Sequence, residues 1–174
     1  SKEVYIPNEE VRQEFVRAVK NGSRRELVKA VQLSDQLLDA TLNLDTETVS
    51  EILEEFHQTG TSQKFYNNEQ ALRSVVIMAY LSSVEHYMRF EELASGKGYS
   101  DILFLPNATS SKPALLIELK WDKSAPGAIL QMKKKNYPQT LKKFKYHGEI
   151  LLVGINYSTR SKKHTCKIER YQIQ

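Results

Sequence analysis

The chain has 174 residues, a formal net charge of +4 and 40% hydrophobic residues, which suits one ordinary globular domain or a small domain with an appendage. Its single cysteine, Cys166, excludes an internal disulfide and a cysteine-rich zinc site. No apolar run approaches the roughly 20 residues of a membrane helix, and no secretion leader is recognisable. We therefore expect a cytoplasmic protein without a membrane partner.

The charge is unevenly distributed along the chain. Residues 1–118 hold 12 Lys and Arg against 18 Asp and Glu, whereas residues 119–174 hold 13 against 3. A basic region attracts polyanions and releases counterions from a nucleic-acid backbone. A run such as Lys133, Lys134 and Lys135 is therefore a candidate nucleic-acid contact, although a solvated lysine face explains such a run equally well.

Three helices are predicted within residues 1–62. Asn8, Ser23 and Asp45 are typical capping residues, and each precedes a segment with apolar residues at helical spacing. The third helix is expected to end near Gly60, because glycine commonly terminates helices. This acidic part contains no convincing catalytic cluster. We interpret it as a helical subdomain or an inter-domain connector.

Residues 63–174 are predicted to form an α/β domain. The expected order is a helix, three strands, a helix and two further strands, which implies a mixed sheet flanked by helices with an αβββαβ core. The predicted ranges are a helix from Asn68–Glu69 to Tyr87, strands near 88–93, 99–105 and 114–121, a helix over 125–145, and strands over 149–157 and 163–172.

The strand over 113–121 ends in Glu118-Leu119-Lys120 after a run of apolar residues. Side chains alternate along a strand, so Glu118 and Lys120 share one face. Burying them unpaired is costly, and a nearby Asp101 with a divalent cation would satisfy both. Two plainer interpretations stay open: Asp101 could simply start a strand, and Glu118 with Lys120 could form a cross-strand ion pair.

A larger pattern links this strand to its neighbours. Gly96-Lys-Gly-Tyr-Ser-Asp101, Ile117-Glu-Leu-Lys-Trp121 and Ala125-Pro-Gly-Ala-Ile-Leu-Gln131, followed by Tyr137, together resemble the PD-(D/E)XK nuclease superfamily. Within that superfamily, the chain is most similar to the nuclease domain that follows an AAA-ATPase-like domain in many bacterial proteins. The resemblance implies a restriction-endonuclease-like fold.

The resemblance also implies roles for the motif residues. Asp101 and Glu118, helped by the Leu119 carbonyl, would bind Mg²⁺ or Mn²⁺, which are ions that prefer oxygen ligands. Lys120 would position the attacking water and stabilise the transition state of phosphodiester hydrolysis. Ser100 stands where the superfamily name has Pro, but the chemistry depends on the Asp that follows.

Further positions match the family less specifically. Glu69 falls where the family has a helix-starting Glu that often adds a metal contact, but an i,i+4 pair with Arg73 explains it equally well. Glu92 also matches a family position. Gln131 falls where related nucleases place a Gln that touches the site or the DNA backbone. Tyr137 is a candidate nucleic-acid contact, although a tyrosine in this setting is more often part of the core.

The sequence thus predicts a metal-dependent nuclease that acts on DNA, joined to an AAA-ATPase-like domain in the full-length protein. The alternative is a catalytically silent or partner-activated module that binds nucleic acid. A structural adaptor is a third interpretation, and it predicts an exposed apolar patch instead of an acidic pocket with a basic rim. The choice between DNA and RNA, between endonuclease and exonuclease action, and between a monomer and a homodimer stays open.

Overall fold

Five strands form one mixed sheet in the computed structural model, which describes residues 24–60, 66–91 and 101–172. The strand order in the sheet follows the chain, and neighbours are antiparallel except β3 and β4, which run parallel. The strands are β1 (Tyr87–Glu91), β2 (Ile102–Pro106), β3 (Ala114–Trp121), β4 (Ile150–Ser158) and β5 (Lys163–Tyr171). This is the predicted restriction-endonuclease-like α/β sheet.

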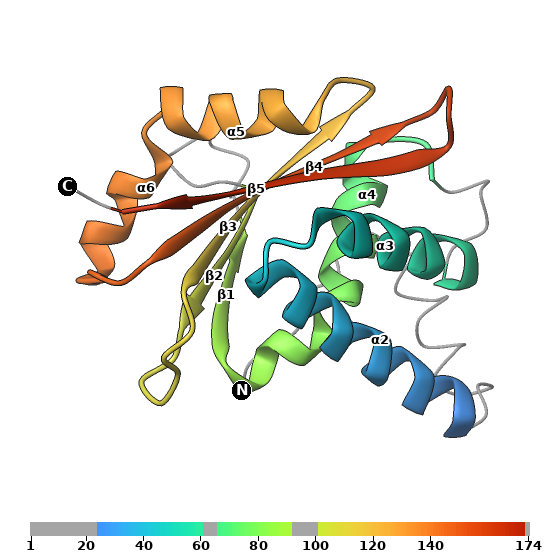
Figure 1. The fold of residues 1–174 in the computed structure, drawn as a ribbon, viewed down its shortest axis with the longest axis horizontal. Coiled ribbons are helices and arrows are strands. Elements are labelled where there is room, and N and C mark those ends of the chain that lie inside the picture. The colour runs from blue at the N-terminus through green and yellow to red at the C-terminus, as the bar shows by residue number, and fades with distance from the viewer. Residues whose placement is uncertain (1–23, 61–65, 92–100, 173–174) are drawn as a thin grey trace.

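Helices cover both faces of the sheet (Figure 1). One face carries α2 (Arg24–Leu42), α3 (Thr46–Gly60) and α4 (Glu69–Ala79), which is followed by the 3₁₀ helix η2 (Leu81–Glu85). The other carries α5 (Ala125–Lys134), α6 (Tyr137–Thr140) and the 3₁₀ helix η3 (Leu141–Phe144). Within the described part of the chain, no helix has the length and apolar composition needed to cross a membrane.

The alternation of side chains along β3 separates two cores. Leu115, Ile117 and Leu119 pack with α2, α3 and α4, whereas Ala114 and Leu116 pack with α5 and α6. The first core also contains residues of α2 and α3, so these helices and the sheet share one hydrophobic cluster. The division of the chain at residue 62 stays a prediction. Alternation directs the last even-numbered side chains of β3 towards α5.

Polar caps define where several helices begin, as predicted. The Asn68 side chain accepts a hydrogen bond from the Ala71 amide at 2.9 Å at the start of α4. The Asp45 carboxylate accepts one from the Thr48 amide at 3.2 Å at the start of α3. Such caps satisfy amides that have no partner inside the helix. The predicted helix after Asn8, together with residues 61–65 and 92–100, lies outside the described residues.

The helix that starts at Glu69 is shorter than predicted, because it ends at Ala79 instead of continuing to Tyr87. One serine side chain turns back onto the backbone in the next segment: the Ser83 hydroxyl donates to the Tyr80 carbonyl at 2.6 Å. Bonds of this kind compete with regular helical hydrogen bonds. The chain therefore continues as a 3₁₀ helix and enters β1 at Tyr87.

The predicted helix over residues 125–145 was also wrong in extent, since α5 ends at Lys134. Asn136 adopts a left-handed backbone conformation with φ 59°, which interrupts a right-handed helix. Pro138 follows, and proline has no amide hydrogen for a bond to the preceding turn. The remaining residues form α6 and η3, and Lys145 ends the segment in a second left-handed conformation with φ 56°.

Gly154 of β4 allows α5 to lie close to the sheet. A Cβ atom at this position would meet the Ala125 carbonyl oxygen at 2.5 Å and the Ala128 Cβ at 3.1 Å. Gly154 is paired in register with Glu118 on β3, and paired residues of neighbouring strands face the same side. The missing side chain therefore brings α5 down beside Glu118 and so positions the residues that α5 contributes to the site.

Candidate active site

The end of β3 extends beyond its neighbour β2, and this difference creates the site. Register pairs join β2 to β3 from Ile102–Phe104 to Leu115–Ile117. Asp101 immediately precedes β2 and takes the next place beside β3, where its Oδ2 accepts a hydrogen bond from the Leu119 amide at 2.7 Å. Asp101 is 3% exposed. The carboxylate is thus held by the strand that carries the Glu-x-Lys motif.

Glu118, Lys120 and Gln131 form one connected group on the α5 face of the sheet. The Gln131 amide nitrogen donates to Glu118 Oε1 at 3.2 Å, and its carbonyl oxygen accepts a hydrogen bond from Lys120 Nζ. Lys120 Nζ lies 3.9 Å from Glu118 Oε1, and Glu118 is 4% exposed. The structure therefore brings together three residues that the sequence had singled out, and Gln131 bridges the carboxylate and the ammonium group.

Arg73 of α4 is a part of the site to which sequence reasoning gave another role. Its guanidinium donates to Asp101 Oδ1 at 2.8 Å, so the observed ion pair is not the i,i+4 pair with Glu69 that the spacing suggested. Arg73 Nε is buried and has no hydrogen-bond partner among the described residues. The available signal was its position one helical turn after Glu69, which directs it to the same face of α4.

Glu69 is the first residue of α4 and lies exposed at the rim of the site. Partial burial of its carboxyl group raises the pKa of Glu69, and the nearby Asp101 carboxylate raises it further. Lys120, Arg73 and Lys123 act in the opposite direction. The Glu69 carboxylate therefore lies within the range of the charges on Asp101 and Lys120. Glu92, the other family position, lies outside the described residues.

The donor set fits a hard divalent cation. Asp101 and Glu118 supply carboxylate oxygens that are buried close to the same stretch of β3. The amide and carbonyl of one strand residue point to the same side, so the Leu119 carbonyl shares the side on which its amide meets Asp101. Mg²⁺ and Mn²⁺ prefer such oxygen ligands. The positive charges of Arg73 and Lys120 offset the negative charges of the two carboxylates.

The predicted nucleic-acid contacts occupy different surroundings. Lys133 pairs with Glu169 of β5 at 2.5 Å, whereas Lys134 and Lys135 are exposed. Tyr137 is 5% exposed and packs in the core beneath α5 and α6, as the structural interpretation of this tyrosine expects. Its ring is therefore not placed to stack on a nucleic acid.

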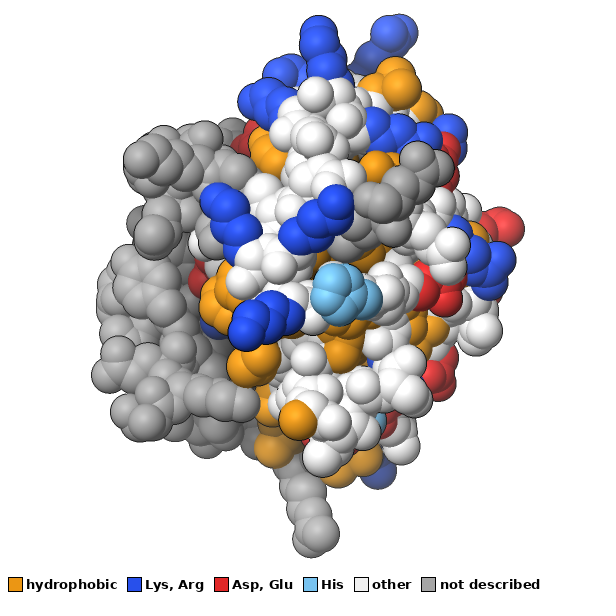
Figure 2. Space-filling view, turned by 90° about the vertical axis from the view of Figure 1, so that its left-hand side faces the viewer, with side chains coloured by type: hydrophobic (Ala, Val, Ile, Leu, Met, Phe, Trp, Pro, Cys, Tyr) orange, Lys and Arg blue, Asp and Glu red, His pale blue; other side chains and the backbone are white. Residues whose placement is uncertain are grey.

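Basic side chains continue beyond α5. Figure 2 shows Lys and Arg side chains gathered at the top of one face of the molecule and recurring across its middle, on the side where Figure 1 places α6. Exposed lysines in this part of the chain include Lys142, Lys143 and Lys145 of η3 and its cap. The carboxylate site therefore lies in a molecule whose α5–α6 side is rich in positive charge.

A comparison with protein families agrees with this geometry. The family model of the PD-(D/E)XK nuclease superfamily matches residues 67–167, a span that contains Asp101, Glu118, Lys120 and Gln131. This span is more than half of the chain, which thus belongs to the PD-(D/E)XK nuclease superfamily. The comparison with curated proteins found no match.

Proposed function

We propose that the chain is a metal-dependent nuclease that hydrolyses phosphodiester bonds in DNA, with Mg²⁺ or Mn²⁺ as its ion. One observation carries the proposal: buried Asp101 accepts a hydrogen bond from Leu119, the residue between Glu118 and Lys120, and Gln131 bridges Lys120 to buried Glu118. We call Asp101, Glu118, Lys120 and Gln131 the β3 site. Membership of a nuclease superfamily supports the same reaction class.

The residues of the β3 site would have separate roles in hydrolysis. Asp101, Glu118 and the Leu119 carbonyl would hold the ion, and the exposed Glu69 would add an outer contact. A divalent ion bound there would lower the pKa of a water ligand and neutralise charge that develops on the scissile phosphate. Every one of these donors is oxygen, as Mg²⁺ requires.

Lys120 supplies a positive charge that the protein itself holds in place. Its side chain is 12% exposed and its ammonium group is hydrogen bonded to Gln131. Such a fixed, poorly solvated donor stabilises negative charge better than a mobile surface lysine, because it needs little reorganisation. Lys120 would therefore orient the attacking water or a phosphate oxygen, and Gln131 would keep Lys120 directed at the reacting group.

The basic side of the molecule suits a polyanionic substrate. Lys134 and Lys135 are exposed at the end of the helix that contributes Gln131 to the site. A backbone that contacts these lysines would be guided electrostatically towards the carboxylates, and its affinity would fall as the salt concentration rises. Nothing in such contacts reads base sequence, so we expect recognition of the backbone more than of particular bases.

Cleavage assays on several nucleic acids test the proposal. The wild-type chain is incubated with circular DNA, linear DNA and RNA in Mg²⁺, in Mn²⁺ and with a chelator. We expect metal-dependent cleavage of DNA. Cleavage of RNA alone would overturn the substrate assignment. Salt-sensitive DNA binding without cleavage in either metal would favour a catalytically silent or partner-activated module, for which an AAA-ATPase-like domain is the expected activator.

A further inference from the structure

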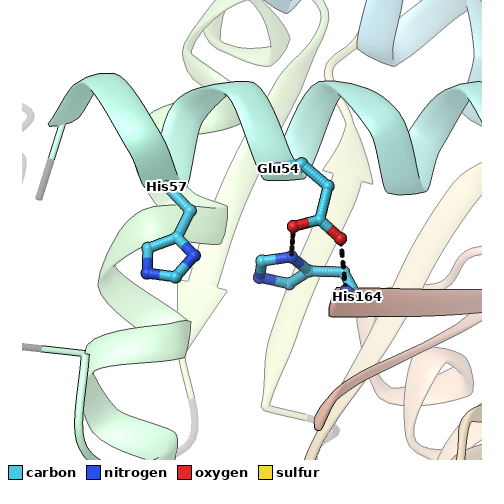
Figure 3. Close-up of side chains that lie close together, drawn as sticks. All are labelled: Glu54, His57 and His164. Atoms are coloured by element: carbon cyan, nitrogen blue, oxygen red, sulfur yellow. Dashed lines mark hydrogen bonds and ion pairs between the residues drawn. The ribbon is translucent and has the colours of Figure 1, made fainter. Parts of the chain in front are cut away.

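A second group of titratable side chains lies on the opposite face of the sheet, between α3 and β5. Glu54 and His57 are three residues apart on α3 and so share one side of the helix, and His164 extends from β5 towards them (Figure 3). Each of the three offers a donor atom, and these atoms lie within 4.8 Å of one another. We call Glu54, His57 and His164 the α3–β5 cluster.

The position of His164 is fixed from three directions. Its backbone amide donates to Glu54 Oε1 at 2.6 Å, and its Nδ1 lies 3.2 Å from Glu54 Oε2. On the other side of the ring, Nε2 is 2.6 Å from the hydroxyl of Tyr66. The His164 side chain is fully buried. Its ring is therefore held with Nδ1 facing the carboxylate and Nε2 engaged by a tyrosine.

In each of the two imidazoles, one ring nitrogen makes no hydrogen bond within the described part of the chain and could instead bind a metal. His164 Nδ1 and His57 Nε2 are buried and make no hydrogen bond with the described residues. Burial lowers the pKa of His164 to about 4, and burial together with His164 lowers the pKa of His57. Both rings are thus neutral near pH 7, the state in which an imidazole binds a metal.

Glu54 also lacks a strong cationic partner. Its ion-pair partner among the described residues is His164, which is neutral near pH 7. Burial raises the pKa of Glu54, and the His164 amide, His57 and Lys163 lower it by less. A bound cation would supply a full positive charge. The β3 site differs, because Arg73 and Lys120 already supply positive charge to its carboxylates.

We propose that Glu54, His57 and His164 bind a first-row divalent cation, with Zn²⁺ as the ion whose preferences they meet best. Two imidazoles and one carboxylate form a common zinc donor set, with metal–ligand distances of about 2.0–2.2 Å. Donors at these bond lengths lie about 3.3 Å apart in a tetrahedral site, so the three donor atoms, which lie within 4.8 Å of one another, would draw together when the ion binds. The Glu54 side chain is 24% exposed, so solvent can deliver the ion and supply a fourth ligand.

The surrounding residues suit this role. A histidine that binds a metal through one nitrogen usually donates its other N–H to a fixed oxygen acceptor, and Tyr66 stands at that place beside His164 Nε2. Tyr66 also stacks on His57, with ring centroids 3.7 Å apart. The ion would link α3 to β5, elements that are far apart in the chain, and it would stabilise the packing of the helices on the sheet. This role is separate from phosphodiester hydrolysis.

Zinc binding to the whole chain tests the proposal. We titrate Zn²⁺ into the wild type by calorimetry with excess Mg²⁺ present to occupy the β3 site, and we record visible absorption with Co²⁺ as a spectroscopic substitute. We expect one Zn²⁺ per chain, a Co²⁺ spectrum typical of tetrahedral nitrogen and oxygen ligation, and a higher melting temperature. Glu54→Gln keeps the shape of the side chain and should weaken Zn²⁺ binding roughly 100-fold, since even residues behind the ligands change affinity by 10–100-fold.

Matched variants separate the outcomes. His164→Gln should also lose Zn²⁺, whereas Glu51→Gln, an exposed change on the same helix, and His147→Gln, an exposed histidine elsewhere, should bind normally. Tyr66→Phe should weaken binding about tenfold. Glu118→Ala, a β3-site variant, should retain the Zn²⁺. If wild type and Glu54→Gln bind Zn²⁺ alike, or if Glu118→Ala abolishes binding, the cluster is a packed contact only and the proposal is overturned.

Discussion

Each face of the sheet carries a group of ionisable side chains, and the two groups differ in how the negative charge of their carboxylates is balanced. In the β3 site, buried Asp101 and Glu118 lie beside cationic Arg73 and Lys120. In the α3–β5 cluster, the carboxylate of Glu54 meets imidazoles that burial keeps neutral. The first arrangement is already near charge balance, whereas the second is not.

This difference bears on which ions each group can hold. The β3 site offers oxygen atoms and keeps a lysine next to them, as expected where an ion and a charged substrate meet. The α3–β5 cluster offers mainly nitrogen and has no lysine in an ion pair with Glu54 among the described residues, a donor set that suits Zn²⁺ better than Mg²⁺. We therefore expect the two groups to be separable by mutation.

The largest expected effect is the loss of cleavage in Glu118→Gln. The substitution keeps the shape of the side chain but removes the charge that would bind the ion, so the cleavage rate should fall about 10³-fold, in the range seen when one strong electrostatic contact is removed. Nicking of a supercoiled plasmid measures the rate. Glu149→Gln, an exposed residue paired with Arg170, is the matched control. Activity within tenfold of wild type in Glu118→Gln would contradict our assignment of the metal ligand.

The next effect concerns the close packing of α5. In Gly154→Ala the new methyl group would meet the Ala125 carbonyl oxygen at 2.5 Å, and backbone atoms cannot move away easily. Overpacking of this kind costs about 1–3 kcal/mol, which urea denaturation measures. In Gly127→Ala the new methyl group would meet the Ser124 hydroxyl, a side-chain atom that caps α5 and can yield more easily than backbone, so this control should cost less. Equal losses in both variants would show that the approach of α5 does not depend on Gly154.

A smaller effect is expected for Gln131→Ala. The variant removes the bridge between Glu118 and Lys120 but leaves both charges in place. Cleavage should fall about tenfold, which corresponds to the modest free energy of one charge-assisted hydrogen bond. Leu130→Ala, at an exposed position next to it on α5, should cleave at the wild-type rate. Unchanged cleavage in Gln131→Ala would remove Gln131 from the β3 site.

The smallest effect tests the ion pair between Arg73 and Asp101. Arg73→Gln removes the positive charge that is paired with Asp101 and that repels a cation. Mg²⁺ should therefore bind about threefold more tightly at low ionic strength. Calorimetric titration of Mg²⁺ measures the change, with Arg89→Gln as the control because Arg89 pairs with Glu91 instead. Weaker Mg²⁺ binding in Arg73→Gln would show that Arg73 supports the ion site instead of competing with it.

The proximity of Glu118 and Lys120 could be predicted because that part of the geometry is local. Glu118 and Lys120 are two residues apart on a strand, so their shared face follows from alternation alone. The location of Asp101 needed the pairing of neighbouring strands, which the family resemblance supplied. Arg73 could not be assigned, because its choice between Glu69 and Asp101 depends on how α4 sits against the sheet.

The sequence predicted less about the α3–β5 cluster and about where helices end. Glu54 and His164 are 110 residues apart, and the register that brings them together is set by the packing of α3 on β5. The break after α5 depends on the backbone conformation of Asn136, a residue that tolerates the left-handed region without requiring it. Long-range packing and single backbone choices of this kind are not encoded in a local pattern.

Single-turnover cleavage of plasmid DNA by wild type and Lys120→Met tests the central claim most directly. Methionine keeps most of the side-chain volume and removes the charge, and DNA binding is measured in the same samples. We predict that wild type cleaves in Mg²⁺ and not with a chelator, and that Lys120→Met binds DNA normally while its cleavage rate falls at least about 100-fold. Equal cleavage by the two proteins, or cleavage that persists with the chelator, would contradict the assignment of the β3 site as the active site.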